Sequence, residues 1–374
     1  MNILHLDTER TWRGGEQQMC YLALGLEQRG HIAHLVCRPG SECESRAKEL
    51  GLTVHPIRIR GDIDVRAARR IARLIDGLGI DIAHAHTARA HLPVVWAKSL
   101  SKRPLATVVH RRVDFSIHKL PFGLSGLKYR SGVDRFIAVT AAVKRQMIKD
   151  GIKADLIDVI HSGADLSRFA GSECTPGLRE ELGIPEGARV IGNVGFLVGH
   201  KDHANLLHAA TKVLKRFPEA FFVVIGEGEL RGELEALARS LGILDSVSLP
   251  GFRRDVPACL KEFEVFCLSS WGEGIGGVVL EAMASRLPVV STRAGGLDEV
   301  VRDGENGLLV PVRDSDALAA ALCRMLSDHD ASQRMAVAGH ETVKQDFSVD
   351  RMVERTITVY ERILGAFGRR SCIY

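Results

Sequence analysis

The sequence predicts an α/β protein of two domains, each built on a parallel β-sheet with helices on both faces. The chain has 374 residues, more than a single hydrophobic core usually organises. Short apolar runs, which are typical of strands buried on both faces, alternate with longer helical patterns. This alternation is typical of doubly wound sheets, whose ligands bind at the carboxyl ends of the strands.

The first half of the chain starts directly in a strand. A long amphipathic helix follows the loop 7–16 and turns Met19, Leu22 and Leu26 inward. Gly51 suits the end of the next helix, and Asp62 suits the start of a basic helix over 63–78. The strands expected here are 1–6, 32–37, 54–57, 82–85, 105–109, 136–140 and 157–160.

The second half repeats the pattern after residues 170–187, whose Pro and Gly residues are typical of a linker. The chain enters a strand at Arg189, and Asp255 suits a helix start. Helices fill the last part, ending with 349–364. The strands expected here are 189–194, 220–225, 247–250 and 264–268.

One turn of the second half, between strand 264–268 and a helix starting at Gly277, combines glycines with two glutamates. Helix amides and the positive end of the helix dipole attract phosphate. Glu273 and Glu281 do not favour phosphate, but their carboxylates accept hydrogen bonds from hydroxyl groups. A nucleotide sugar carries hydroxyls on both sides of a diphosphate. The alternative is a strand–turn–helix whose glutamates are merely solvated.

The pattern Glu-Gly-Ile-Gly-(x)4-Glu-Ala-Met-Ala from Glu273, followed by Pro-Val-Val at 288–290, resembles the signature of the retaining glycosyltransferases of family four. The resemblance implies the GT-B fold, in which two Rossmann-like domains face each other across a cleft. In that family the first Glu contacts the donor hexose, the second binds the ribose, and the turn amides hold phosphate and sugar. It therefore implies a catalytic role for Glu273 and donor contacts for Gly274, Ile275, Gly276, Gly277 and Glu281.

Residues 195–201 resemble the family segment Val-Gly-Arg-Leu-x-x-x-Lys, whose Arg and Lys contact the donor phosphate. Lys201 matches, which implies a catalytic role, because a cation stabilises the charge that develops on the departing diphosphate. Phe196 stands at the Arg position, and Arg111 and Arg253 are candidates to replace the missing cation. Gly195 and Phe196 of this segment are further expected donor contacts, and two turns that lie near the nucleotide base in the family add Gly228 and Arg253.

The first half is expected to complete the reaction centre. Gly14 and Gly15 open a helix, and in the family such a pair lies against the diphosphate. His110 follows a strand, at the place where the family has a histidine that reaches the donor sugar, so the resemblance implies a catalytic role. His84 and His86 form a His-x-His pair, but no third ligand lies nearby in the sequence, and we expect no bound metal.

The resemblance covers nearly the whole chain. It implies an acceptor-binding domain at 1–168, a donor-binding domain at 169–348 and a final helix, 349–374, that crosses back to the first domain. The implied reaction moves a sugar from a UDP-, GDP- or ADP-linked donor to a hydroxyl, with retention and without a cofactor. A nucleotide-sugar epimerase and a non-catalytic nucleotide-sugar-binding protein remain alternatives, and Phe196 favours the second.

The charge is distributed unevenly. The net charge is +4, but residues 1–168 carry +10 and the remainder −6, which suggests an anionic partner for the first domain. No nucleic-acid-binding motif accompanies it. Residues 110–130 interleave basic with aromatic and aliphatic side chains, which suits either an anionic bilayer surface or a cleft-lining loop. Solvated surface charge is the alternative.

We expect a glycan or lipid-linked acceptor from lipopolysaccharide-type synthesis, handled in the cytoplasm at the inner face of the membrane. The sequence has no long apolar run and no signal peptide at its start. The eight cysteines are scattered and contain no Cys-x-x-Cys pair, which is typical of a reduced cytosol.

Overall fold

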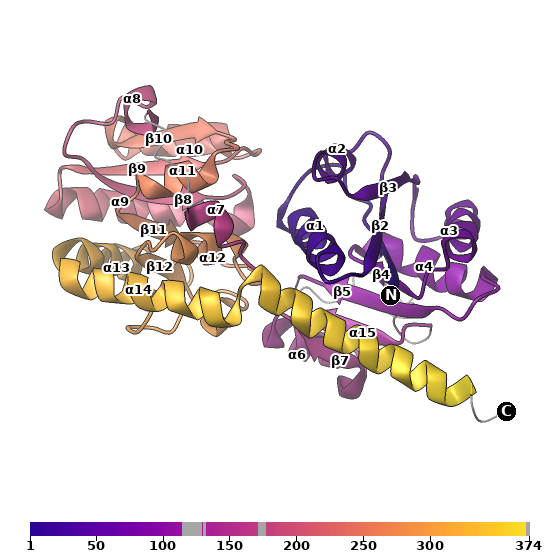
Figure 1. Cartoon of the computed structure of the whole chain (residues 1–374). Coiled ribbons are helices and arrows are strands. Elements are labelled where there is room, and N and C mark those ends of the chain that lie inside the picture. Colours follow the sequence, from indigo (N-terminus) through magenta and orange to yellow (C-terminus); the bar gives the residue numbers. More distant parts are fainter. Residues whose placement is uncertain (114–128, 130–131, 171–176, 372–374) are drawn as a thin grey trace. The chain divides into compact units, whose positions relative to one another are not determined.

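The computed structural model describes residues 1–113, 129, 132–170 and 177–371, and the chain forms two compact units (Figure 1). Unit 1 comprises Met1–Gly163 and the segment from Val349 onward, and unit 2 comprises Ala164–Ser348. Most of the basic, apolar stretch 110–130 and part of the expected linker lie outside the described residues. Each unit has a parallel sheet with helices, which confirms the predicted α/β class.

Unit 1 contains seven parallel strands in the order β3-β2-β1-β4-β5-β6-β7. The order reverses between β1 and β4, which is the place where open parallel sheets bind ligands. The strands are β1 Asn2–Leu6, β2 Ile32–Cys37, β3 Thr53–Pro56, β4 Ile82–Ala85, β5 Ala106–Arg111, β6 Arg135–Ala138 and β7 Ile157–Val159. The helices of eight or more residues are α1 Gly14–Glu27, α2 Glu42–Glu49, α3 Val65–Leu78, α4 Ala88–Leu100, α6 Ala141–Lys149 and α15 Val349–Ser371.

The start of α3 differs from the sequence prediction. Asp64, rather than Asp62, caps the helix, and its Oδ1 accepts a hydrogen bond from Ala67 N at 2.9 Å. Asp64 directly precedes the first helical residue, and only from there does a side chain reach the free amides of the first turn.

Helix α15 packs against α1 within unit 1 (Figure 1). Val353 and Tyr360 are fully buried and share a core cluster with Leu22 and Leu26. Gly25 permits the close approach, because a Cβ there would lie 2.5 Å from Val353 Cγ2. The C-terminal helix is therefore an integral part of the hydrophobic core of unit 1.

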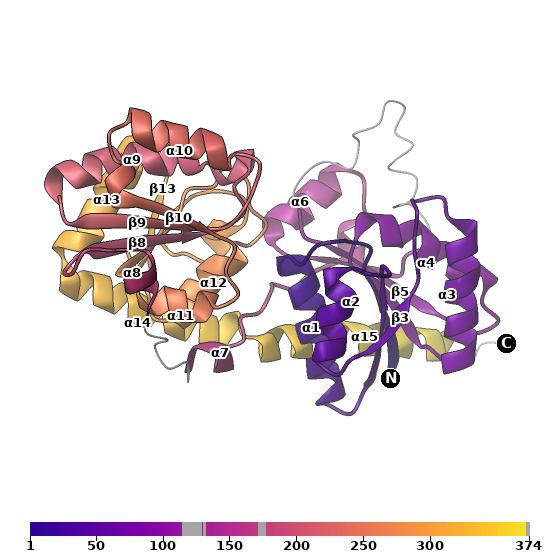
Figure 2. The same ribbon diagram turned by 90° about the horizontal axis from the view of Figure 1, so that it is seen from above.

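Unit 2 contains six parallel strands in the order β10-β9-β8-β11-β12-β13, and the order reverses between β8 and β11. Helices α9, α10 and α13 cover one face of this sheet, and α11, α12 and α14 cover the other (Figure 2). The strands are β8 Arg189–Val194, β9 Ala220–Ile225, β10 Val247–Gly251, β11 Val265–Leu268, β12 Val289–Thr292 and β13 Leu308–Val310. The helices are α7 Ser167–Ala170, α8 Leu178–Glu181, α9 His203–Arg216, α10 Arg231–Ser240, α11 Val256–Lys261, α12 Gly277–Ala284, α13 Ser315–Ser327 and α14 His329–Asp346.

No helix in the described part of the chain is long and apolar enough to cross a membrane.

Candidate functional site

Lys201 and Glu273 meet at the point where the strand order of unit 2 reverses. Lys201 ends the short 3-10 helix Gly199–Lys201 after β8, and Glu273 lies in the turn after β11. Because β8 and β11 are parallel neighbours, both loops leave the sheet at the same edge. Lys201 Nζ forms an ion pair with Glu273 Oε1. The exposed fractions of the two side chains are 16% and 9%, so the pair is largely shielded from water.

Ser270 holds the same carboxylate oxygen of Glu273. The hydroxyl of the fully buried Ser270 donates a hydrogen bond to Glu273 Oε1 at 2.7 Å. The hydroxyl of Thr292 on β12 donates a hydrogen bond to the carbonyl oxygen of Ser270. Nearby, Ser269 Oγ donates to the carbonyl of Lys201 at 3.0 Å. Among described residues, no hydrogen bond is recorded to Oε2, which leaves this oxygen available to a ligand. The sequence reasoning missed Ser270, although its position two residues after the strand was a usable signal.

The glycine turn is supported by a second loop. Gly276 precedes α12 in the left-handed conformation, with φ 67°. Gly295 also has a positive φ, 59°, and a Cβ there would lie 1.8 Å from the Glu273 carbonyl oxygen. Gly296 N donates to Gly274 O at 3.0 Å. Backbone packing therefore fixes the turn, while no described residue lies within 4 Å of a Cβ built at Gly277.

Glu281 lies on α12, one turn from its start, as the sequence predicts. Its Oε1 is 3.5 Å from Arg168 Nη1 of α7, and its side chain is 21% exposed. Burial raises the pKa of the Glu281 carboxyl, and the Arg168 charge acts in the opposite direction. Arg168 thus favours the ionised carboxylate, the form that accepts hydrogen bonds from hydroxyls. The sequence reasoning did not single out Arg168.

The other expected donor residues of unit 2 lie around β8 and β9. Gly195 lies beside the aliphatic part of the Lys201 side chain: a Cβ added at position 195 would be 3.7 Å from Lys201 Cδ. Gly228 has no room for a side chain, since a Cβ would lie 2.3 Å from the Leu197 carbonyl oxygen. Phe196 is 38% exposed. Gly228 therefore allows the loops after β8 and β9 to lie close together.

The two candidate replacements for the family arginine already have partners. Arg253 forms ion pairs with Asp255 and Glu181, both at 2.7 Å, and the hydrogen bonds to them raise its pKa. Arg111 donates to Tyr129 Oη at 3.5 Å. Asp255 precedes α11 as expected, but its carboxylate binds Arg253 and does not cap the helix.

In unit 1, the expected residues lie where the strand order reverses between β1 and β4. Thr8 Oγ1 and Thr87 Oγ1, from the loops after these strands, lie 2.8 Å apart. Gly14 and Gly15 start α1 as predicted, with open space beside Gly14. The Cβ position of Gly15 is 3.6 Å from Cδ of Arg112. These placements bring a helix start and a cation together at the ligand-binding edge of the sheet.

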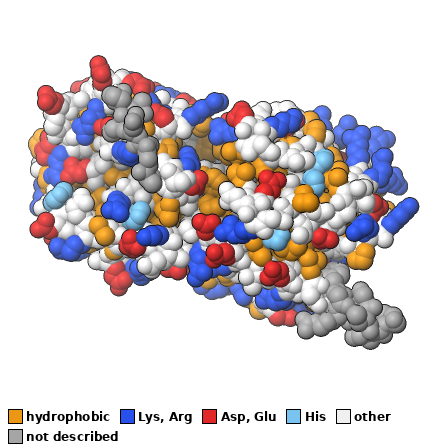
Figure 3. Space-filling view, in the orientation of Figure 1, with side chains coloured by type: hydrophobic (Ala, Val, Ile, Leu, Met, Phe, Trp, Pro, Cys, Tyr) orange, Lys and Arg blue, Asp and Glu red, His pale blue; other side chains and the backbone are white. Residues whose placement is uncertain are grey.

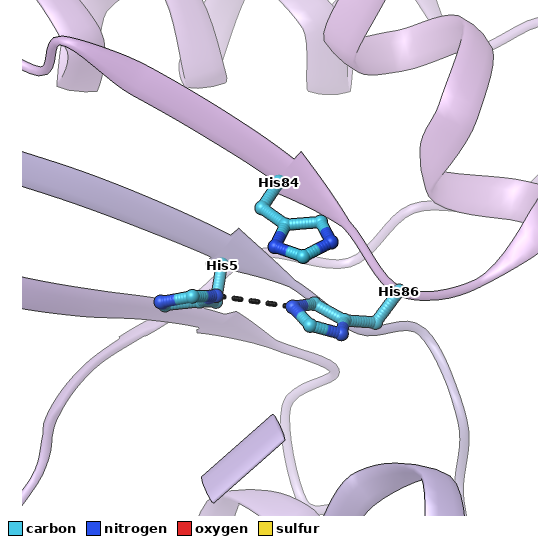
Figure 4. Close-up of side chains that lie close together, drawn as sticks. All are labelled: His5, His84 and His86. Atoms are coloured by element: carbon cyan, nitrogen blue, oxygen red, sulfur yellow. Dashed lines mark hydrogen bonds between the residues drawn. The ribbon is translucent and has the colours of Figure 1, made fainter. Parts of the chain in front are cut away.

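His110 lies in a cluster of four buried histidines. His84 stacks on His110 at 5.6 Å between ring centroids, and His84 Nδ1 is 2.6 Å from Tyr360 Oη of α15. His5 Nδ1 and His86 Nε2 are 3.0 Å apart (Figure 4). The sequence offered no third ligand beside His84 and His86, but the structure supplies His5, because β1 and β4 are parallel neighbours. Ligand atoms of His5, His84 and His86 lie within 4.8 Å of one another.

Arg112 opposes a metal ion in this cluster. Both terminal nitrogens of its guanidinium lie 3.3 Å from His86 Nδ1, and an arginine can only donate. A neutral His86 must then carry its proton on Nε2 and donate it to His5 Nδ1. The two nitrogens that face each other in Figure 4 are thus used in a hydrogen bond, and a cation would meet the Arg112 charge. That the protein binds no metal stays a prediction.

The histidine cluster predicts a loss of stability in acid. Burial is the main cause that lowers the pKa of His5, to about 3, and those of His84, His86 and His110 well below 6.5. Between about pH 3 and 6.5 the unfolded chain therefore binds more protons at these sites than the folded chain does. The free energy of unfolding then decreases as the pH drops, by about 1.4 kcal/mol per pH unit for each such proton. Asp7 and Glu16, whose pKa values are raised by burial, act in the opposite direction.

We expect the thermal midpoint of unit 1 to decrease when the pH is lowered from 7 to 5. His5→Gln should make this decrease smaller, because about one proton fewer is taken up on unfolding. The exposed His329→Gln is the control. Equal pH dependence of wild type and His5→Gln would contradict the prediction.

Comparison with known proteins agrees with this architecture. Residues 175–342 match the model of the glycosyl transferases group 1, and residues 12–168 match that of glycosyltransferase family 4. The lipopolysaccharide core biosynthesis glycosyltransferase LpsE of Rhizobium meliloti is 28% identical over 344 residues, which cover 91% of this chain and 94% of LpsE. A D-inositol 3-phosphate glycosyltransferase of Corynebacterium urealyticum is 40% identical, over 49% of this chain and 45% of its own length.

The fold recurs in the Anabaena protein HepE, which was solved in complex with UDP and glucose. The TM-score is 0.83 at 22% identity, and the match covers 97% of this chain and 100% of HepE. The two matched family models cover most of both units, including Lys201 and Glu273, where the strand order of unit 2 reverses. The chain belongs to the group 1 glycosyltransferases of the GT-B fold.

Proposed function

We propose that this glycosyltransferase moves a sugar from a nucleotide diphosphate to a hydroxyl of a glycan or lipid-linked acceptor, with retention of anomeric configuration and without a metal ion. The pairing of Lys201 with Glu273 where the strand order of unit 2 reverses carries the proposal. It brings a cation suited to a diphosphate beside a carboxylate suited to sugar hydroxyls. UDP bound to HepE, which shares the fold, supports a nucleotide-sugar donor.

The chemistry of the site assigns the roles. Lys201 and the amides of the turn Ile275–Gly277 would stabilise negative charge on the departing diphosphate. Glu273 would position the sugar through Oε2, and Glu281 would bind the ribose hydroxyls. The Glu273 carboxylate is tied through Oε1 to Lys201 and Ser270, which suits positioning better than nucleophilic attack. We therefore favour front-face displacement, in which the departing phosphate takes the acceptor proton.

Lipopolysaccharide core synthesis is the setting we propose, at the inner face of the cytoplasmic membrane. Its support is the likeness to LpsE over nearly the full length of both chains and the charge of +10 over residues 1–168.

A panel of UDP-, GDP- and ADP-sugars tests the donor. We expect one of them to raise the thermal midpoint and to be hydrolysed slowly to the nucleoside diphosphate in the absence of acceptor. An altered sugar in the recovered nucleotide would instead indicate an epimerase. Stabilisation without hydrolysis or transfer to any acceptor would indicate a binding protein, the alternative that Phe196 favours. No response to any donor would contradict the proposal.

Glu281→Ala is expected to weaken donor binding about tenfold or more, because a hydrogen bond to a charged group contributes about 1.5–3 kcal/mol. Isothermal titration with the donor found in the panel measures this. Arg168→Ala should weaken donor binding in the same direction but less. Unchanged donor affinity in Glu281→Ala would remove Glu281 from the ribose site.

A further inference from the structure

Four arginines occur at the edge of the unit 1 sheet where the strands have their carboxyl ends. Strands β3, β2, β1 and β4 are adjacent and parallel, so the loops at their carboxyl ends lie in a row. Each of these loops, or the helix start after it, contributes at least one arginine, and Arg13 and Arg60 lie further along two of the loops. In the order of the strands, the first arginine after each strand is Arg58, Arg38, Arg10 and Arg89.

Backbone hydrogen bonds bring the first three together. Ile57 N donates to Cys37 O at 3.1 Å, which places Arg58 beside Arg38. Ser41 N donates to Arg38 O at 3.1 Å, and Glu42 N donates to Arg10 O at 3.2 Å. The loop after β1 is thereby joined to the loop after β2.

The fourth arginine lies in a segment that the threonines described above, Thr8 and Thr87, join to the loop after β1. Arg89 follows Thr87 by two residues. Partial loss of hydration and the charges of Arg10, Arg58 and Arg89 lower the pKa of the Arg38 guanidinium, while Glu9 acts against them. The four loops that carry these arginines are therefore neighbours along this edge of the sheet, and Arg38 lies within electrostatic reach of the other three.

These guanidinium groups are unused in the described structure. Arg10, Arg58 and Arg89 are exposed and Arg38 is partly so, and none of the four makes a recorded side-chain ion pair or hydrogen bond with a described residue. The two glutamates in the first turn of α2 are already paired within their helix, Glu42 with Arg46 and Glu44 with Lys48. Like charges held together without partners destabilise a folded surface, so this arrangement suits a function better than a structural role.

We propose that Arg10, Arg38, Arg58 and Arg89 form the recognition site for an anionic group, phosphate or carboxylate, on the acceptor glycan. Guanidinium groups match both anions with paired hydrogen bonds. The row lies in the unit assigned to the acceptor, so the inference rests on the proposed function and narrows the acceptor to an anionic saccharide.

The site is distinct from the basic surface of α3. Lys and Arg side chains gather over α3 in Figure 3, and this helix exposes Arg66, Arg69, Arg70 and Arg73. Arg70 and Arg73 border a hollow together with Pro56 and Ile57 at the end of β3, so Arg66 and Arg69, which do not line this hollow, serve as the matched control for charge.

The test uses the full chain and the deacylated oligosaccharide of a rough lipopolysaccharide as the probe. We expect Arg38→Gln with Arg58→Gln to weaken probe binding by on the order of tenfold or more, and the control Arg66→Gln with Arg69→Gln to leave it within twofold. Wild-type binding should also weaken as salt rises. Treating one sample with phosphatase and reducing the carboxyl groups of another identifies which anion is recognised.

An equal loss of probe affinity in both double variants would overturn the proposal, because it would show that binding depends only on the overall positive charge of unit 1. Undiminished binding of a probe that lacks both phosphate and carboxylate would also overturn it. The proposal would also be overturned if the Arg38→Gln, Arg58→Gln variant bound the probe normally but no longer bound vesicles of anionic lipid. The row of arginines would then contact a membrane. Probe binding is measured without donor and without turnover. A negative result in this experiment can therefore be distinguished from a negative result in the donor panel, which tests the proposed function.

Discussion

Replacing Glu273 with glutamine is expected to lower the rate of sugar transfer by about a hundredfold or more while the protein stays folded. Glutamine keeps the size of the side chain and an oxygen for Ser270. It removes the charge that pairs with Lys201 and the carboxylate offered to the sugar. Loss of one preorganised polar contact at a reaction centre typically costs about a hundred- to a thousandfold in kcat.

Initial rates at saturating donor, with the acceptor found for the enzyme, measure the effect. Glu305→Gln, which breaks an ion pair with Arg302 at a side chain that is 71% exposed, makes the same chemical change away from the site and should leave the rate within twofold. A Glu273→Gln enzyme within tenfold of wild type would remove Glu273 from the reaction centre.

A double-mutant cycle shows whether Lys201 and Glu273 act together. Lys201→Met should also lower the rate strongly, and the double variant should lose much less than the product of the two single losses, because each single change already breaks the pair. Independent effects, with the two losses multiplying, would mean that the ion pair of the unliganded site has no role in turnover.

Gly295→Ala is expected to abolish measurable donor binding and to destabilise unit 2. A Cβ at 295 would lie 1.8 Å from the Glu273 carbonyl oxygen, and the residue has a φ of 59°. The clash must push the Glu273 turn away from its support, in addition to about 1–2 kcal/mol for the left-handed backbone.

Gly304→Ala separates these two effects. Gly304 has a φ of 76°, but no described residue lies within 4 Å of its Cβ position. This variant should lower the thermal midpoint slightly and keep donor affinity. If both variants bind the donor equally well, the contact between the 295 loop and the Glu273 turn does not shape the site.

Much of the fold followed from local patterns. Strands that are buried on both faces, such as 220–225, form uninterrupted apolar runs, and the alternation with helices then implies parallel pairing. Capping was harder to predict, because Asp62 and Asp64 carry the same side chain at the same helix start. Only the exact turn of the backbone decides which one reaches the Ala67 amide.

The candidate site was predictable where chemistry and spacing coincide in one segment, as in the turn that carries Glu273 and Glu281. Contacts between distant segments were not. His5 meets His86 across 81 positions, and the partner of Glu281 is Arg168, 113 positions away. Such pairs depend on which strands become neighbours, and the order of strands in the sheet has no local signal.

The position of α15 has a consequence for synthesis on the ribosome. Unit 2 is one continuous stretch, Ala164–Ser348, whereas unit 1 needs residues from both ends of the chain. Tyr360 and Val353, which are fully buried in unit 1, are translated after all of unit 2. The nascent chain can therefore complete its second unit while its first still exposes an unfilled groove. A chain released after residue 348 would contain all of unit 2 but would lack the helix that fills the core of unit 1.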